Sequence, residues 1–289
     1  MPPRHPLAFT ALSAASFAAM AICTRIVTRT LPGGEVAFLR FVLMFAPFLL
    51  LPRFARRAVR IQRLDLLVYR GLFGGIAVLL YFLAIQHLQV GTATLLNYSS
   101  PIWSVLFAAV FLGERFRWLV LLPATIALSG VALVTGAFAR GGLFAGFGRW
   151  ELAGFVSAIL SGAAVAAIRA ARRTESSWSI YGSFSLFGLV ATAPFALAGW
   201  KTPTPREWLW LGLVGATSIA AQMSMTFAYR WVTNVQSGAF SQVTVILAYA
   251  MGALFLGEPY GPPQIAGSLL TLVGVLGVIW VQAPPRTVV

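Results

Sequence analysis

One segment occurs twice in this chain, and the duplication constrains the fold more than any local pattern does. A shift of 144 residues places Phe111-Leu112-Gly113-Glu114 on Phe255-Leu256-Gly257-Glu258. The same register, without a gap, aligns further identical residues: Ala84 with Ala228, Ile102 with Ile246, Ala109 with Ala253, Leu128 with Leu272, Gly130-Val131 with Gly274-Val275, and Val134 with Val278. We therefore predict two duplicated halves, residues 1–145 and 146–289.

Composition places both halves in a membrane. Of the 289 residues, 59% are hydrophobic and only 10% are charged, whereas a soluble domain carries about 25% charged residues. Such a chain cannot cover its surface with polar groups, so we expect it to be embedded in a lipid bilayer. The first apolar run, from Leu7, is interpreted as a transmembrane helix and not as a signal peptide, because many apolar spans follow it.

A spanning helix needs about 20 apolar residues. Ten segments meet this requirement, so the sequence predicts an all-α membrane protein with spans at residues 7–30, 33–51, 64–88, 91–112, 117–138, 150–170, 176–199, 206–230, 234–256 and 262–282. Small residues within them, such as Gly267 and Gly274, permit close packing between helices.

The basic residues predict the orientation of these spans. With the N-terminus in the cytoplasm, most of the 21 lysines and arginines face the cytoplasm, as the positive-inside rule requires. Ten spans then place both termini there. Each half has five spans, so the second half enters the membrane from the opposite side. Inverted repeats of this kind are typical of transporters, whose substrate site lies near the midplane between the repeats.

Several motifs give the chain a resemblance to a known family. Pro101 lies in the fourth span, Leu112-Gly113-Glu114 ends it, and Gly130-Val131 closes the fifth span. Leu256-Gly257-Glu258 and Gly274-Val275 repeat the pattern. With Leu39-Arg40-Phe41 in the second span, these features resemble the EamA-type members of the drug/metabolite transporter superfamily. The second half departs from the pattern, since Val245 replaces Pro101 and Phe184 replaces Arg40.

The resemblance implies a multi-pass exporter of amino acids and related small metabolites in the bacterial inner membrane. The chain looks most like the aromatic amino-acid exporter branch. We expect alternating access around a central cavity, a small-molecule substrate, no cofactor and a monomer. A carrier of a different metabolite, such as a sugar, a nucleotide-linked or a drug-like solute, is the alternative. A phosphate cargo would favour several arginines in mid-span, and only Arg40 fits that description.

Two polar pairs are the first candidates for substrate binding. Asn97-Tyr98 and Ser241-Gln242 are equivalent under the 144-residue shift, and each lies about 5–7 Å from the centre of its span. Inverted repeats would place them on opposite sides of one cavity. Hydrogen bonds between helices are the competing interpretation.

Pro101 adds a free backbone carbonyl near this point, because its ring nitrogen carries no proton. We expect the helix to bend or open there. The carbonyl could bind an ammonium group of the substrate, or Ser99 and Ser100 could satisfy a packed kink.

Other polar and aromatic side chains extend the candidate site. Tyr81, Trp103 and Trp178 are candidate walls for an apolar or aromatic side chain of the substrate. Gln222 is the most polar side chain near the centre of the eighth span. For the aromatic residues, packing between helices or exposure to lipid is the competing interpretation.

Charged residues near the spans are interpreted as structural or gating residues. Arg40, about seven residues into the second span, could pair with Glu35, reach the membrane surface or bind a substrate carboxylate, and structural pairing is favoured. Glu114 and Glu258 end their spans, so we expect them to bind nearby backbone or arginines. No acidic residue lies near a span centre, which favours neutral or zwitterionic cargo over cationic drugs.

Other function classes lack their signatures. The net charge of +14 is explained by topology and does not indicate nucleic-acid binding, since the arginines lie between apolar runs. Cys23 is the single cysteine and the two histidines are far apart, which disfavours a disulfide or a metal site. Without His-Glu-x-x-His, an aspartate pair or a Ser-His dyad within the spans, we expect no enzyme activity.

Overall fold

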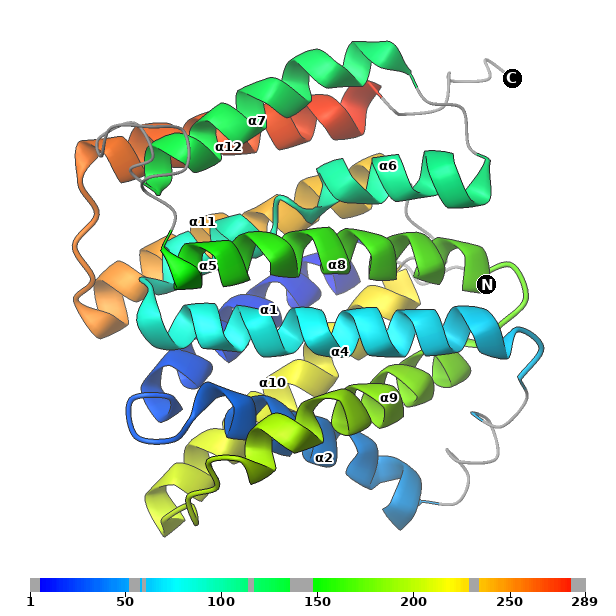
Figure 1. Cartoon of the computed structure of the whole chain (residues 1–289), viewed down its shortest axis with the longest axis vertical. Helices are drawn as coiled ribbons and strands as arrows, with labels where there is room; N and C mark the ends of the chain where they lie inside the picture. Colours follow the sequence, from blue (N-terminus) through cyan, green and yellow to red (C-terminus); the bar gives the residue numbers. More distant parts are fainter. Residues whose placement is uncertain are drawn as a thin grey trace.

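The computed structural model describes residues 6–51, 58, 61–113, 117–135, 148–228 and 234–281, with side chains from residue 8 onward and without those of 234–240. The described part contains helices and no strands (Figure 1). In chain order these are α1 (Pro6–Val27), α2 (Gly33–Leu50), α4 (Leu64–His87), α5 (Val90–Asn97), α6 (Ser100–Leu112), the 3-10 turn η1 (Trp118–Val120), α7 (Leu121–Val134), α8 (Arg149–Ala171), α9 (Ser177–Leu197), α10 (Pro205–Ala228), α11 (Asn234–Leu256) and α12 (Pro262–Val281).

The helices agree closely with the predicted spans. Among the described residues, eight segments are long and apolar enough to cross a membrane, and Val90–Leu112 is one of them although it contains two helices. Two further apolar helices, Trp118–Val134 and Ser241–Leu256, are shorter. The chain is therefore an all-helical, multi-pass membrane protein.

The fourth span is interrupted at the predicted position. Helix α5 ends at Asn97 and α6 begins at Ser100, one residue before Pro101. Pro101 has no N–H for the carbonyl of Asn97, and the N–H of Ile102 donates to Ser99 O instead of Tyr98 O. The side chain of Gln242 supplies the missing donor, with Nε2 3.2 Å from Tyr98 O. The helix opens here, and a side chain of the second half satisfies the exposed backbone.

The repeated Phe-Leu-Gly-Glu motif marks the end of a helix in both halves. Gly113 follows α6 and Gly257 follows α11, and each has a φ of 65°. This left-handed conformation is the usual helix stop, and glycine adopts it without a steric cost. The motif's glycine therefore has a structural role.

Helix packing also recurs at the 144-residue spacing. Helix α4 packs along α8, and α1 packs along α10, the pair that occupies the equivalent positions. Helix α6 packs against α8 just as α11 packs against α1. Helices α7 and α12 lie side by side at one end of the long axis, and α2, α9 and α10 lie at the other (Figure 1).

Among the close glycine contacts between helices, the backbones of α7 and α12 approach each other most closely. A Cβ atom on Gly130 would lie 2.5 Å from Gly267 O, and one on Gly274 would lie 2.6 Å from Pro123 O. Residues 123 and 267 are themselves 144 apart, so the two contacts are equivalent. Glycine permits such approach between membrane helices, where packing and not the hydrophobic effect holds helices together.

We predict that Gly130→Ala lowers the stability of the folded protein by about 1–3 kcal/mol, because the added methyl group forces α7 away from α12. Thermal unfolding in detergent measures the effect. Gly212→Ala is the matched control, since a Cβ atom on Gly212 meets no atom within 4 Å. Equal melting temperatures for the two variants would contradict the close-packing explanation.

Candidate functional site

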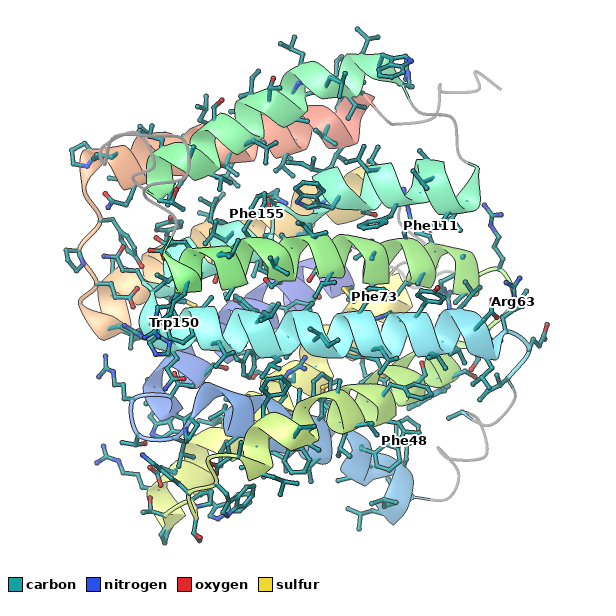
Figure 2. All side chains as sticks on the ribbon, in the orientation of Figure 1. Phe48, Arg63, Phe73, Phe111, Trp150 and Phe155 are labelled. Carbon is teal, nitrogen blue, oxygen red and sulfur yellow. The ribbon has the colours of Figure 1, made fainter. Side chains whose placement is uncertain are left out.

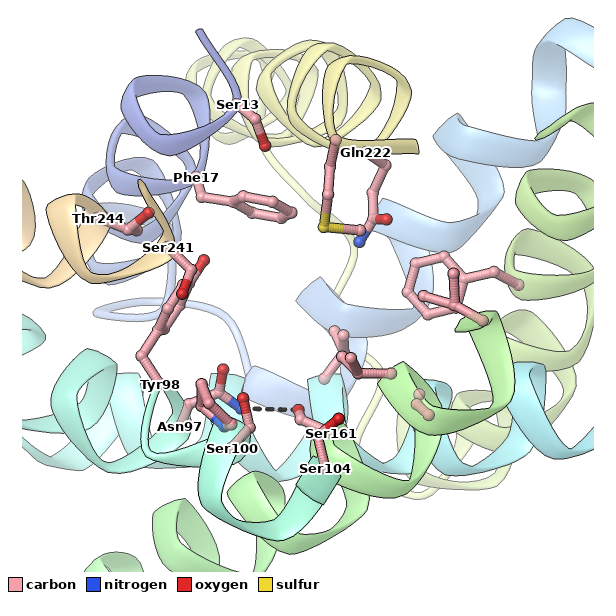
Figure 3. A pocket seen from close by; sticks show the side chains of 18 of the residues that line it. Ser13, Phe17, Asn97, Tyr98, Ser100, Ser104, Ser161, Gln222, Ser241 and Thr244 are labelled. Atoms are coloured by element: carbon pink, nitrogen blue, oxygen red, sulfur yellow. Dashed lines mark hydrogen bonds between the residues drawn. The ribbon is translucent and has the colours of Figure 1, made fainter. Parts of the chain in front are cut away.

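A cavity of about 440 Å³ lies among the helices, and residues of both halves line it. Its size is in the range of small-molecule sites, which is about 300–1,000 Å³. Figure 3 shows Ser13, Phe17 and Gln222 facing Asn97, Tyr98 and Ser241 across the open space. Because these side chains come from four different helices or their ends, α1, α5, α10 and α11, the cavity depends on helices of both halves.

Many lining residues are equivalent under the 144-residue shift but differ in chemistry. Seven pairs of this kind line the cavity: Phe17 with Ser161, Met20 with Ala164, Arg40 with Phe184, Val78 with Gln222, Tyr81 with Met225, Asn97 with Ser241, and Ser100 with Thr244. The same positions of each half therefore surround one space, and each pair presents it with two different side chains.

Most of the predicted site residues line this cavity. Tyr81, Asn97, Tyr98, Pro101, Gln222 and Ser241 are all among its walls. Asn97 Nδ2 donates to Ser157 Oγ at 2.8 Å. It also donates to Ser161 Oγ at 3.1 Å, the bond drawn as a dashed line in Figure 3. Tyr81 Oη is 2.9 Å from Thr94 Oγ1. Asn97 and Tyr81 thus line the cavity and also form hydrogen bonds to a neighbouring helix.

Three predicted residues lie behind the walls. Ser99 is fully buried and donates to Leu96 O at 2.7 Å. Trp103 packs edge-on against Phe155 of α8, which is labelled in Figure 2, with ring centroids 5.6 Å apart. Gln242 is buried and supports the open backbone at Tyr98. Trp178, the remaining candidate wall residue, is partly buried and packs against the apolar cluster around Phe41 and Tyr181.

Arg40 lines the cavity and is 1% exposed. Its Nε donates to Ser218 Oγ at 2.8 Å, and its guanidinium lies 4.9, 5.8 and 5.6 Å from the ring centres of Phe41, Phe82 and Phe184. Nη1 is buried and has no hydrogen-bond partner among the described residues.

The predicted partner of Arg40 is engaged elsewhere. Glu35 Oε2 accepts the backbone N–H of Lys201 at 2.9 Å, and no ion pair joins Glu35 to Arg40 in the described part of the chain. Pairing with Glu35 was therefore the wrong expectation. Arg40 is held by a hydroxyl group and aromatic faces, which leaves part of its donor capacity unused.

The cavity contains further arginines that sequence reasoning assigned to membrane topology. Arg70, Arg169, Arg172 and Arg173 all line it. Arg70 lies about two turns into α4, and its guanidinium is 3.8 Å from the ring centre of Phe184. Arg40 is thus one of several arginines at the cavity. The signal in the sequence was their position, since Arg70 and Arg169 fall inside the predicted spans 64–88 and 150–170 and not between spans.

Glu258 makes contacts at the other ends of the helices, away from Arg70 and Arg169. Its Oε2 accepts the N–H of Val90 at 2.8 Å and the hydroxyl of Tyr260 at 2.7 Å, and its Oε1 lies 3.4 Å from Arg25 Nε. Burial raises the pKa of Tyr260, and the hydrogen bond to the Glu258 carboxylate raises it further. Glu258 therefore ties the start of α5 to α1 and to the loop after α11. The equivalent Glu114 lies outside the described residues.

Comparison with protein families gives a match over both halves. The model of the EamA-like transporter family matches residues 6–136 and again residues 148–280. A solved crystal structure aligns with 94% of this chain and 94% of its own, with a TM-score of 0.61 and 22% identity. At that identity the structural likeness bears on the fold alone.

Several curated proteins are similar over much of their length. The pseudopaline exporter CntI of Pseudomonas aeruginosa is 26% identical over 92% of each chain. A probable terminal-alkyne amino-acid exporter of Streptantibioticus cattleyicolor is 28% identical over 66% of this chain and 64% of that protein. An S-adenosylmethionine uptake transporter of Rickettsia bellii is 23% identical over 93% of this chain and 91% of that protein. All three names describe carriers of small metabolites.

We predict that Glu258→Ala destabilises the protein by about 2 kcal/mol, because Val90, Tyr260 and Arg25 lose a charged partner. The melting temperature in detergent tests this. Asp65→Ala is a suitable control, since Asp65 is an exposed carboxylate whose ion pair with Arg63 is local. If the control variant were equally destabilised, Glu258 would have no special part in joining α5 to α1.

Proposed function

The chain belongs to the EamA-like transporter family, and from this premise we propose that it is a secondary transporter that exports a small metabolite by alternating access. We propose that residues 1–145 and 146–289 form two inverted five-helix repeats with both termini in the cytoplasm. Neither enzyme activity nor a cofactor belongs to this proposal, and a monomer in the bacterial inner membrane is its expected form.

One observation carries the proposal. Equivalent positions of the two halves line a single cavity within the membrane spans. A site on the pseudo-two-fold axis between inverted repeats can be exposed to either side of the membrane when one repeat moves against the other. Two features lie near that axis: the close glycine contacts between α7 and α12, and the helix break at Pro101.

The lining residues also indicate which side the cavity faces. Thr10 is near the start of α1, Arg70 is near the start of α4, and Arg169 is near the end of α8. With the N-terminus in the cytoplasm, these three helix ends lie on the cytoplasmic side. The opposite ends are joined by Glu258, Arg25 and Val90. We propose that this conformation is open toward the cytoplasm, as loading of an exporter requires.

The side chains of the cavity suit an amino-acid-like cargo. Asn97, Ser241 and Gln222 offer hydrogen bonds, and Phe17, Tyr81 and Tyr98 offer aromatic surface. Aromatic and other neutral amino acids are therefore the first cargo to test. One relative is named a pseudopaline exporter and another a probable terminal-alkyne amino-acid exporter, and the second name supports a metabolite with amino-acid chemistry. A sugar, nucleotide-linked or drug-like cargo is the alternative.

Counterflow in proteoliposomes tests the proposed function. Vesicles are loaded with unlabelled phenylalanine, tryptophan, threonine or methionine, and the uptake of the same labelled amino acid is followed without an ion gradient. Uptake that requires both protein and internal amino acid establishes an amino-acid carrier. Absence of exchange for each amino acid, with exchange of another metabolite, would establish the alternative cargo.

We predict that Tyr98→Ala reduces counterflow at least tenfold at an equal amount of folded protein, because the cavity loses both an aromatic wall and a hydroxyl group. Trp280→Ala is the matched control. Trp280 is an aromatic residue that is 75% exposed on the outside of the bundle, so its loss leaves the cavity intact. Unchanged flux in Tyr98→Ala would remove Tyr98 from the substrate site.

A further inference from the structure

The charge of the cavity gives an inference about the cargo that rests on the proposed carrier function and makes it more specific. Five arginines line the cavity, and no aspartate or glutamate is among its described lining residues. Several of the described acids make contacts elsewhere. For example, Glu175 accepts the N–H groups of Gln62 and Arg63, and Glu258 binds Val90. The charged side chains among the described lining residues are therefore all positive.

Arg40 is the deepest of these charges. It is almost fully buried, its Nη1 has no hydrogen-bond partner among the described residues, and it reaches the cavity wall. A buried guanidinium is costly unless a partner satisfies its donors. Nothing described in the protein supplies that partner, whereas an anionic group of a substrate in the cavity can.

Arg70 lies beside Arg40, on the same aromatic ring. The guanidinium carbons of Arg40 and Arg70 are 5.6 and 3.8 Å from the ring centre of Phe184. Gly74, one turn after Arg70 on α4, makes room for this arrangement, because a Cβ atom at Gly74 would collide with Arg70 Nη1 and lie 2.9 Å from the Phe184 ring. The fold thus holds two positive charges close together at the cavity despite their mutual repulsion.

The remaining arginines extend the positive surface toward the helix ends. Arg169 lies in the last turn of α8, and Arg172 and Arg173 follow directly. A substrate that enters between these residues and reaches Arg40 passes positive charge along its path. Planar guanidinium groups bind carboxylates through two parallel hydrogen bonds.

We propose that the cargo is a small organic anion with at least two carboxylates, one bound by Arg40 and a second bound near Arg70 and the Arg169–Arg173 segment. The ammonium or hydroxyl groups of such a cargo face Asn97, Tyr98 and Ser241 on the other wall. Neutral amino acids, with one carboxylate, occupy only the Arg40 end. They are transported more slowly than acidic relatives of the same size.

Two peptides that differ in one functional group test the proposal. Alanyl-glutamate has two carboxylates, and alanyl-glutamine has an amide in place of the side-chain carboxylate at nearly the same shape. Binding of each to the purified full-length protein in nanodiscs is measured by titration calorimetry at low and high salt. We expect the acidic peptide to bind at least tenfold more tightly, with an advantage that falls as ionic strength rises.

Variants locate the effect. Arg40→Gln and Arg70→Gln should each weaken binding of the acidic peptide about tenfold or more and reduce the difference between the peptides. Arg40→Lys keeps the charge without the planar fork and is the second variant at this position if glutamine impairs folding. Arg206→Gln is the control, since Arg206 is exposed and away from the cavity. It should leave both affinities unchanged.

The outcomes separate this inference from the proposed function. Equal binding of the two peptides, or no binding of either, overturns the proposed anion selectivity. Counterflow of phenylalanine or methionine that persists in that case leaves the carrier function standing. Preferred binding of the acidic peptide without any counterflow of it supports the anion site and contradicts the carrier function.

Discussion

The hydrogen bond from Gln242 to the backbone of Tyr98 is the interaction on which the cavity depends. A membrane offers no water to an open helix, so each backbone group released at Pro101 needs a partner within the protein. Gln242 is the residue equivalent to Tyr98 in the second half. The break in one half is therefore stabilised by an unbroken helix of the other, and a polar opening can exist at membrane depth.

Duplication followed by divergence explains the chemistry of the walls. Two similar halves that enclose one space would give it identical surfaces. Here Val78 faces the space with Gln222, Phe17 with Ser161, and Arg40 with Phe184. The last pair is in direct contact, with the guanidinium of Arg40 near the Phe184 ring. One half supplies the charge and the other the aromatic face that holds it, so neither half could form this site alone.

The helices could be predicted from the sequence with small errors, because long apolar runs and a repeat that aligns without a gap leave few alternatives. The break at Pro101 was also predictable, since it follows from a missing N–H group. Which residues line the cavity was only partly predictable. Ser99 and Ser100 are neighbours in sequence, yet only Ser100 reaches the cavity, because the turn between α5 and α6 sets the direction of each side chain. Hydropathy gave no such information, as the spans are apolar on all sides.

The arginines show why topology signals can hide a binding surface. Arg169, Arg172 and Arg173 satisfy the positive-inside rule, and that explanation is sufficient until the cavity is seen to extend to them. In the proposed orientation the two roles reinforce each other. Positive charge concentrated at the cytoplasmic opening raises the local concentration of an anionic cargo. On the outer side, Arg25 is already engaged by Glu258 and by the carbonyl of Ile85. Because the positive charge is concentrated at the cytoplasmic opening, an anion would be captured on that side and released on the outer side.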